Sequence, residues 1–83
     1  MNGMKYVVYE DGTYAIFPQT ISHDEMRVMG KTPRSAGFLD ILSIKEGNIK
    51  VDCYGESTSL GIKSIPDEDI EDIEIGWRIS NLI

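Results

Sequence analysis

Two apolar segments near the N-terminus, residues 5–10 and 13–17, flank the dipeptide Asp11-Gly12. Asp-Gly between strand-like segments favours a two-residue hairpin turn, because a type I′ turn requires positive φ at both central residues. Counting outward from that turn predicts four cross-strand pairs: Tyr9 with Tyr14, Val8 with Ala15, Val7 with Ile16 and Tyr6 with Phe17. Both faces of this hairpin are then apolar, so both need cover.

A second hairpin is predicted over residues 36–54, with a two-residue turn at Gly47-Asn48. Apolar residues then face each other across the strands, and a one-residue slip would bury Lys50 and Asp52. A corner rich in glycine and serine follows at residues 55–59. The predicted pairs are Ile44 with Val51, Leu42 with Cys53, Ser43 with Asp52, Ile41 with Tyr54 and Asp40 with Gly55.

A short helix is predicted over residues 23–29, after Pro18 has ended the second strand. Ser22 as N-cap and Glu25 three residues later form a capping box, in which each residue binds a backbone N–H group of the other. We expect about two turns, with Met26 and Met29 pointing into the core.

Two structures compete for residues 66–80. Ile70, Ile73 and Trp77 lie at helical spacing, whereas the apolar residues of 73–79 alternate strictly with polar ones or glycine. Pro66 suits the first turn of a helix, but Gly76 and the β-branched residues weaken a continuous helix. We therefore favour one or two helical turns over residues 66–71 and a strand over residues 73–79.

The predicted fold is a single α+β domain over residues 1–83, with residues 1–3 interpreted as an alternative start or a tail. An antiparallel sheet of four to five strands would combine the two hairpins and the possible C-terminal strand with one or two short helices. Uncovered apolar faces or edges would favour a homodimer or a higher homo-oligomer.

The composition is that of a soluble globular protein, because 41% of the 83 residues are hydrophobic. No apolar run approaches the roughly 20 residues that cross a bilayer, and the N-terminus lacks a signal-peptide pattern. Cys53 has no second cysteine to pair with, which favours a reducing cytoplasm, and its place on an apolar strand face predicts a buried thiol.

The net charge of −6 argues against direct binding to nucleic acid and lies entirely in one acidic segment. Carboxylates in the first turn after Pro66 are partly explained by the helix dipole, but the others have no such local reason. One interpretation is a solubilising surface, and the other is a row of acids that meets a basic partner. The candidate partner-binding residues are Asp67, Glu68, Asp69, Glu71, Asp72 and Glu74.

The segment GESTSLG, residues 55–61, matches neither a nucleophile elbow nor a phosphate-binding loop. His23 is the only histidine and has no suitably spaced partners for catalysis or metal binding. We therefore predict no catalytic residue, metal or cofactor. A second hypothesis is a site for an anionic ligand such as a nucleotide, where a basic loop meets this corner. Its candidate residues are Arg27, Lys31, Arg34, Asp40, Ser57 and Ser59.

Three segments carry a resemblance: FPQTISHDEM, SAGF and CYGESTSLGIKSIPDED. Together they resemble small uncharacterised proteins of bacteriophages and mobile elements, in which Ser-Ala-Gly-Phe and Gly-Glu-Ser-x-Ser-Leu segments recur. The resemblance implies a phage context but no activity and no site residues. The leading hypothesis is a non-enzymatic interaction protein that presents its acidic segment to a basic site on a host protein.

Overall fold

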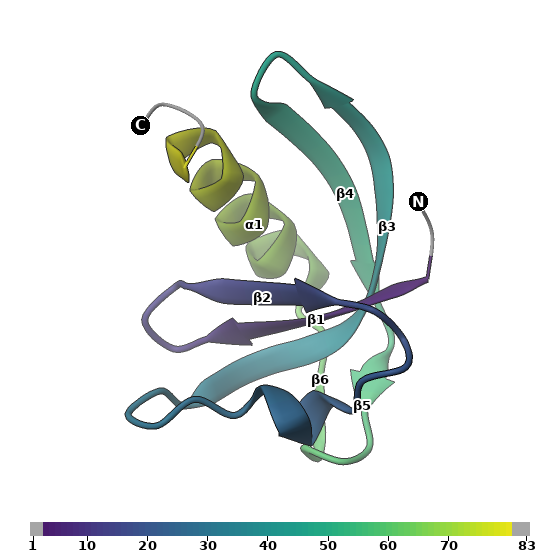
Figure 1. The fold of residues 1–83 in the computed structure, drawn as a ribbon, viewed down its shortest axis with the longest axis vertical. Coiled ribbons are helices and arrows are strands. Elements are labelled where there is room, and N and C mark those ends of the chain that lie inside the picture. The colour runs from purple at the N-terminus through teal and green to yellow at the C-terminus, as the bar shows by residue number, and fades with distance from the viewer. Residues whose placement is uncertain (1–2, 81–83) are drawn as a thin grey trace.

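The chain folds around a four-stranded antiparallel sheet in the order β2-β1-β3-β4 (Figure 1). The computed structural model describes residues 3–80. Its α+β class and its two hairpins agree with the prediction from sequence. The elements are β1 (Met4–Tyr9), β2 (Tyr14–Phe17), the 3-10 helix η1 (His23–Met26), β3 (Pro33–Lys45), β4 (Asn48–Tyr54), β5 (Glu56–Ser57), β6 (Ile62–Lys63) and α1 (Pro66–Ser80).

The β1–β2 turn has three residues, so the predicted two-residue turn is wrong. The Tyr9 N–H donates to the Thr13 carbonyl at 2.8 Å, and Gly12 alone takes a positive φ, of 86°. A three-residue loop with glycine in the left-handed region is a common hairpin connection. The extra residue shifts every predicted pair by one. The observed pairs are Lys5 with Phe17, Tyr6 with Ile16, Val7 with Ala15 and Val8 with Tyr14.

The β3–β4 turn lies at Glu46-Gly47 instead of the predicted Gly47-Asn48. Both residues have positive φ, 49° and 80°, as a type I′ turn requires. The register shifts again between Ile41 and Ser43, which leaves Leu42 without a paired residue and 65% exposed. The predicted pairs were therefore wrong. The observed ones are Phe38 with Tyr54, Leu39 with Cys53, Asp40 with Asp52, Ile41 with Val51, Ser43 with Lys50, Ile44 with Ile49 and Lys45 with Asn48.

Residues 66–80 form one continuous helix, α1, so the predicted strand over residues 73–79 is wrong. Ile73 is fully buried and Trp77 packs against the same cluster, which confirms the helical spacing. Gly76 costs about 1 kcal/mol of helix propensity relative to alanine. Its bare Cα admits the Tyr14 ring, because a Cβ there would lie 2.7 Å from Tyr14 Cε1.

The predicted two-turn helix is a single 3-10 turn, η1, and ends at Met26. The Ser22 N–H donates to the Glu25 carboxylate at 2.8 Å, as a capping box requires. The Tyr9 hydroxyl donates to the Met26 carbonyl, which satisfies a carbonyl at the end of the helix. Met26 packs against the core, but Met29 is fully exposed and does not point inward as predicted.

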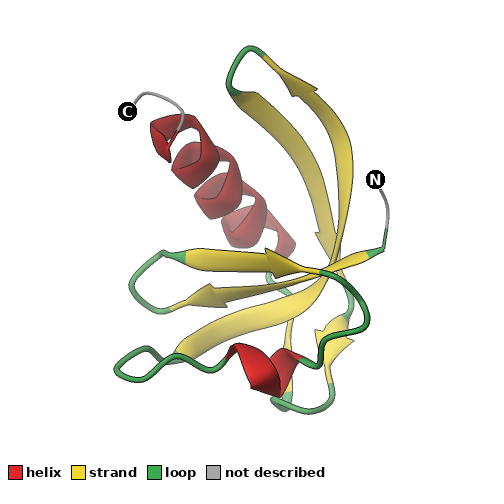
Figure 2. Cartoon of the chain, viewed as in Figure 1, coloured by secondary structure: helices red, strands yellow, loops and turns green. Residues whose placement is uncertain are grey.

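Both faces of the β1–β2 hairpin are covered within the chain, as their apolar side chains require (Figure 2). On one face, α1 packs Ile73 against the cluster that contains Tyr6, Leu39 and Val51. On the other, Val7 and Phe17 belong to a second cluster, which residues from η1 and the β5–β6 connection cover. The sheet is therefore the middle layer, and α1 has its outer surface turned to solvent.

Candidate interaction surface

Asp69 is a fully buried carboxylate that binds four donors. Its Oδ2 accepts the Tyr6 hydroxyl at 2.5 Å and the Ile65 N–H at 2.8 Å. Its Oδ1 accepts the Ser35 hydroxyl at 2.5 Å and Arg34 Nη2 at 2.8 Å. Four donors, one of them cationic, compensate the cost of burying a charge. Asp69 thus joins the start of α1 to β1 and β3, and it lies in the interior.

Two further acids of the predicted set also contact their own chain. Arg34 Nη1 lies 2.8 Å from Asp72 Oδ2, so one guanidinium bridges Asp69 and Asp72. Glu74 Oε2 accepts the backbone N–H of Val51, on the edge strand β4, at 3.1 Å. A carboxylate that binds an edge N–H makes that edge less open to pairing with another strand.

The other three acids, Asp67, Glu68 and Glu71, are exposed on α1. We call these three residues the exposed acids. Helical spacing puts Glu68 on one line with Asp72, Ile75 and Ile79, because residues three and four apart are neighbours on a helix. Ile75 is 43% and Ile79 55% exposed. This line of four residues, the outer stripe of α1, is acidic at its N-terminal end and apolar at its C-terminal end.

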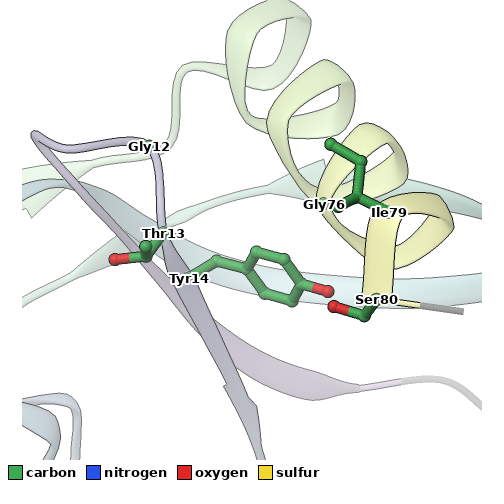
Figure 3. Close-up of a pocket in the computed structure, with 6 residues that line it drawn as sticks. All are labelled: Gly12, Thr13, Tyr14, Gly76, Ile79 and Ser80. Atoms are coloured by element: carbon green, nitrogen blue, oxygen red, sulfur yellow. The ribbon is translucent and has the colours of Figure 1, made fainter. Parts of the chain in front are cut away.

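A pocket of about 460 Å³ lies between the β1–β2 turn and the C-terminal turn of α1 (Figure 3). The Tyr14 ring reaches from β2 toward α1, and its hydroxyl points toward Ser80. Burial raises the pKa of the Tyr14 hydroxyl. Ile79 belongs to both the outer stripe and the pocket, so the two are continuous. The lining residues are Gly12, Thr13, Tyr14, Gly76, Ile79 and Ser80.

Sequence reasoning missed this pocket because it joins segments about 60 residues apart. One local signal was present. A glycine inside a helix costs stability, and it often marks a place where another group approaches the backbone closely. Gly76 has this role toward Tyr14.

Comparison with protein-family models, with curated proteins and with solved structures gave no significant match. In the part of the chain that the structure describes, no helix is both long enough and apolar enough to cross a membrane.

The basic residues predicted for an anionic ligand either bind groups of their own chain or are exposed. Arg34 binds the two α1 carboxylates, and Lys31 Nζ lies 2.7 Å from Thr13 Oγ1 and 3.3 Å from Asp11 Oδ2. Arg27 is exposed in the connection after η1. These contacts hold Arg34 against α1 and Lys31 against the β1–β2 turn.

The polar residues of the same hypothesis also have roles inside the fold. Ser57 is buried, and its Oγ accepts the Leu60 N–H at 3.1 Å and lies 3.4 Å from Ser59 Oγ. Asp40 accepts the Gly3 N–H and the Tyr54 hydroxyl, both at 2.9 Å. None of the six residues lines the pocket beside α1. Ser57 and Ser59 are neighbours, whereas Lys31, Arg34 and Asp40 contact other parts of the fold. The anionic-ligand hypothesis stays a prediction.

His23 is a core residue, 5% exposed. Its Nε2 lies 2.9 Å from the Gly37 carbonyl, and its ring packs edge-on between Phe17 and Phe38. Among residues 3–80, no three His, Cys, Asp or Glu side chains are grouped so that they could hold a metal ion. The contacts of His23 account for it as part of the packing between η1 and β3.

The three segments on which the predicted resemblance rests, residues 17–26, 35–38 and 53–69, contact one another in the fold. Ser35 binds Asp69, and the Gly37 carbonyl faces His23. Gly55 has a φ of 80°, and a Cβ there would lie 2.9 Å from the Phe38 ring. These residues therefore have structural reasons for their identity.

Stability should fall as the pH rises above about 9, because burial raises the pKa of Cys53 from 9.0 to about 12. Burial, and next the hydrogen bond to Asp69, raise the pKa of Tyr6 as well. Between the unfolded and folded pKa values the unfolded chain releases protons that the folded chain keeps, so unfolding becomes more favourable. We expect a loss of about 1–3 kcal/mol between pH 8 and 10.5 in urea unfolding.

The matched variant for this prediction is Cys53→Ala, which should show a smaller change over the same pH range. Equal unfolding free energies of the unsubstituted protein at pH 8 and 10.5 would contradict the prediction.

Proposed function

We propose that this protein is a non-enzymatic interaction protein that presents the exposed acids of α1 to a basic site on a host protein. The supporting observation is that three of the six acids are bound by donors of their own chain and the other three are exposed. Arg34 binds Asp69 and Asp72, and the Val51 N–H binds Glu74. The exposed acids are accessible to solvent. Arg78 is the one basic residue of α1, and its Nε donates to Asn48 on the opposite hairpin.

Electrostatics favours a cationic partner for this surface. The helix dipole stabilises Asp67 and Glu68 in the first turn, but Glu71 lies beyond the range of that effect. Neighbouring carboxylates repel one another, and a basic surface would relieve that repulsion on binding. A surface of this kind steers association and makes it sensitive to salt.

The proposal includes a cellular setting and an oligomeric state. A phage or mobile-element origin, suggested by the sequence resemblance, would make the partner a host protein in the cytoplasm. Leu42 and Ile44, both more than half exposed near the end of the β3–β4 hairpin, support self-association through that apolar surface.

The test uses the triple variant Asp67→Asn, Glu68→Gln, Glu71→Gln, which removes three charges without touching Asp69 or Asp72. Tagged protein is expressed in host cells, and the proteins that copurify with it are quantified by mass spectrometry. We expect recovery of the partner to fall at least tenfold, because several charge contacts are lost together.

The matched control is the triple variant Glu46→Gln, Asp52→Asn, Glu56→Gln, which removes the same charge from exposed positions outside α1. It should recover the partner as the unsubstituted protein does. Equal recovery by the two triple variants, or the absence of any protein whose recovery depends on the exposed acids, would overturn the proposal. Thermal unfolding of both variants verifies that the fold is intact.

A further inference from the structure

We infer that the partner binds through an amphipathic segment, with one apolar side chain in the pocket beside Tyr14 and basic side chains on the exposed acids. This inference rests on the proposed function and adds the chemistry and spacing of the partner's binding segment. It follows from the pocket, from the exposed apolar half of the outer stripe and from the distribution of charge.

The pocket suits an apolar side chain. Its volume, about 460 Å³, falls within the range of binding sites in proteins. The Tyr14 ring, the Ile79 side chain and the bare Cα of Gly76 form apolar walls, and the hydroxyls of Thr13 and Ser80 stand among the lining residues (Figure 3). An apolar anchor surrounded by polar groups is a common arrangement at the centre of protein interfaces.

The outer stripe connects the pocket to the exposed acids without a break. Ile79 lines the pocket, Ile75 continues the apolar surface by one helical turn, and Glu68 lies at the far end. At 1.5 Å per residue, Glu71 and Glu68 lie about 12 and 16 Å from Ile79 along the helix. The partner's basic side chains should therefore reach about 12–16 Å from its apolar anchor, which is about four or five residues in an extended segment and eight to eleven in a helix.

Charge selects a basic partner over a second copy of this chain for this surface. Each copy has a net charge of −6, and its excess acid lies mainly on α1. Pairing α1 with α1 would bring the exposed acids of two copies together, and such like-charge contacts are unfavourable. A small apolar ligand would fill the pocket but would leave the acids without a partner.

The experiment places the photo-crosslinking residue p-benzoylphenylalanine at position 80, at position 68 or at position 29 in otherwise unsubstituted protein expressed in host cells. Position 29 is the control, because Met29 is fully exposed and does not line the pocket. Positions 80 and 68 should crosslink to one segment of the same partner. Its crosslinked peptides should place an apolar residue at position 80 and Lys or Arg at position 68, with the spacing given above.

Two pocket variants complete the test. Ile79→Asn places a polar amide in the apolar wall of the pocket, and Ile79→Ala removes that wall. Each should lower recovery of the partner about tenfold, the loss typical of an interface anchor, while thermal unfolding stays unchanged. The matched apolar control, Val28→Ala, changes an exposed residue that does not line the pocket and should leave recovery unchanged.

The outcomes separate this inference from the proposed function. Crosslinking at position 68 but not at position 80, with full recovery by both pocket variants, would overturn the inference and leave the proposed function standing. Crosslinking at neither position would overturn both. A crosslink from position 80 to a second copy of this chain would also overturn the inference.

Discussion

Replacement of Asp69 by alanine should lower the free energy of unfolding by about 3–5 kcal/mol, the cost of removing one partner from a buried ion pair. The change leaves Arg34 without its buried anion, and it leaves the Tyr6 and Ser35 hydroxyls and the Ile65 N–H without their acceptor. A domain of this size buries a small core, so the loss is a large part of its total stability. Urea unfolding followed by circular dichroism measures it.

Glu71→Ala is the matched control, because it removes an acid from the exposed side of the same helix. Surface substitutions of this kind usually change stability by less than about 0.5 kcal/mol. The loss of stability for Asp69→Asn should fall between the losses for Glu71→Ala and Asp69→Ala. An amide keeps the shape of the side chain and one acceptor oxygen, but it loses the charge. Equal unfolding free energies for Asp69→Ala and Glu71→Ala would show that the buried network does not hold α1 to the sheet.

Gly37→Ala is expected to have the second largest effect, a loss of about 3 kcal/mol or more, at the upper end of what overpacking costs. A Cβ at this position would lie 2.3 Å from the Tyr54 carbonyl oxygen and 3.3 Å from Gly55 C. Both are backbone atoms of the paired strand and its continuation, so a side-chain rotation cannot relieve the clash. Strands β3 and β4 would have to separate where His23 also packs.

Gly12→Ala provides the comparison for Gly37→Ala. Gly12 has a positive φ, but a Cβ at this position would have nothing within 4 Å, so the substitution costs only the left-handed conformation, about 1–2 kcal/mol. Thermal unfolding of both variants should give the lower melting temperature for Gly37→Ala. The opposite order would show that the strands tolerate a side chain at position 37.

The hairpins were predictable from the sequence because strand-like apolar segments on each side of Asp11-Gly12 and Gly47-Asn48 are a local signal. Their registers were not predictable. A three-residue turn at Gly12, a turn displaced by one residue to Glu46-Gly47 and a bulge at Leu42 all depend on how the strands twist and pack. One added residue in a turn changes every pair that follows.

Only the first part of helix α1, residues 66–71, was predicted as helical. Residues 73–79 fit a strand as well as a helix. Tertiary contacts decide it: Asp69 binds β1 and β3 near its start, and Gly76 admits Tyr14 from β2. Both contacts join residues more than 30 positions apart. The β-branched residues of this segment favoured the strand and Gly76 weakened a continuous helix, but packing overrides such preferences.

The acidic segment was visible in the sequence, but the roles of its members were not. Asp69 and Glu71 are two residues apart and chemically alike, yet one is fully buried and the other is exposed. The difference depends on Arg34, which lies 35 positions before Asp69. A linear pattern can therefore locate an acidic surface, but it cannot say which acids hold the fold and which face outward.

The most direct test is the affinity of the purified partner for the unsubstituted protein and for the Asp67→Asn, Glu68→Gln, Glu71→Gln variant, at low and at high salt. We expect the variant to bind at least tenfold more weakly at low salt. The difference should shrink as salt screens the exposed acids. Equal affinities at low salt, with both proteins folded, would contradict the claim that the exposed half of α1 serves binding while the buried half holds the fold.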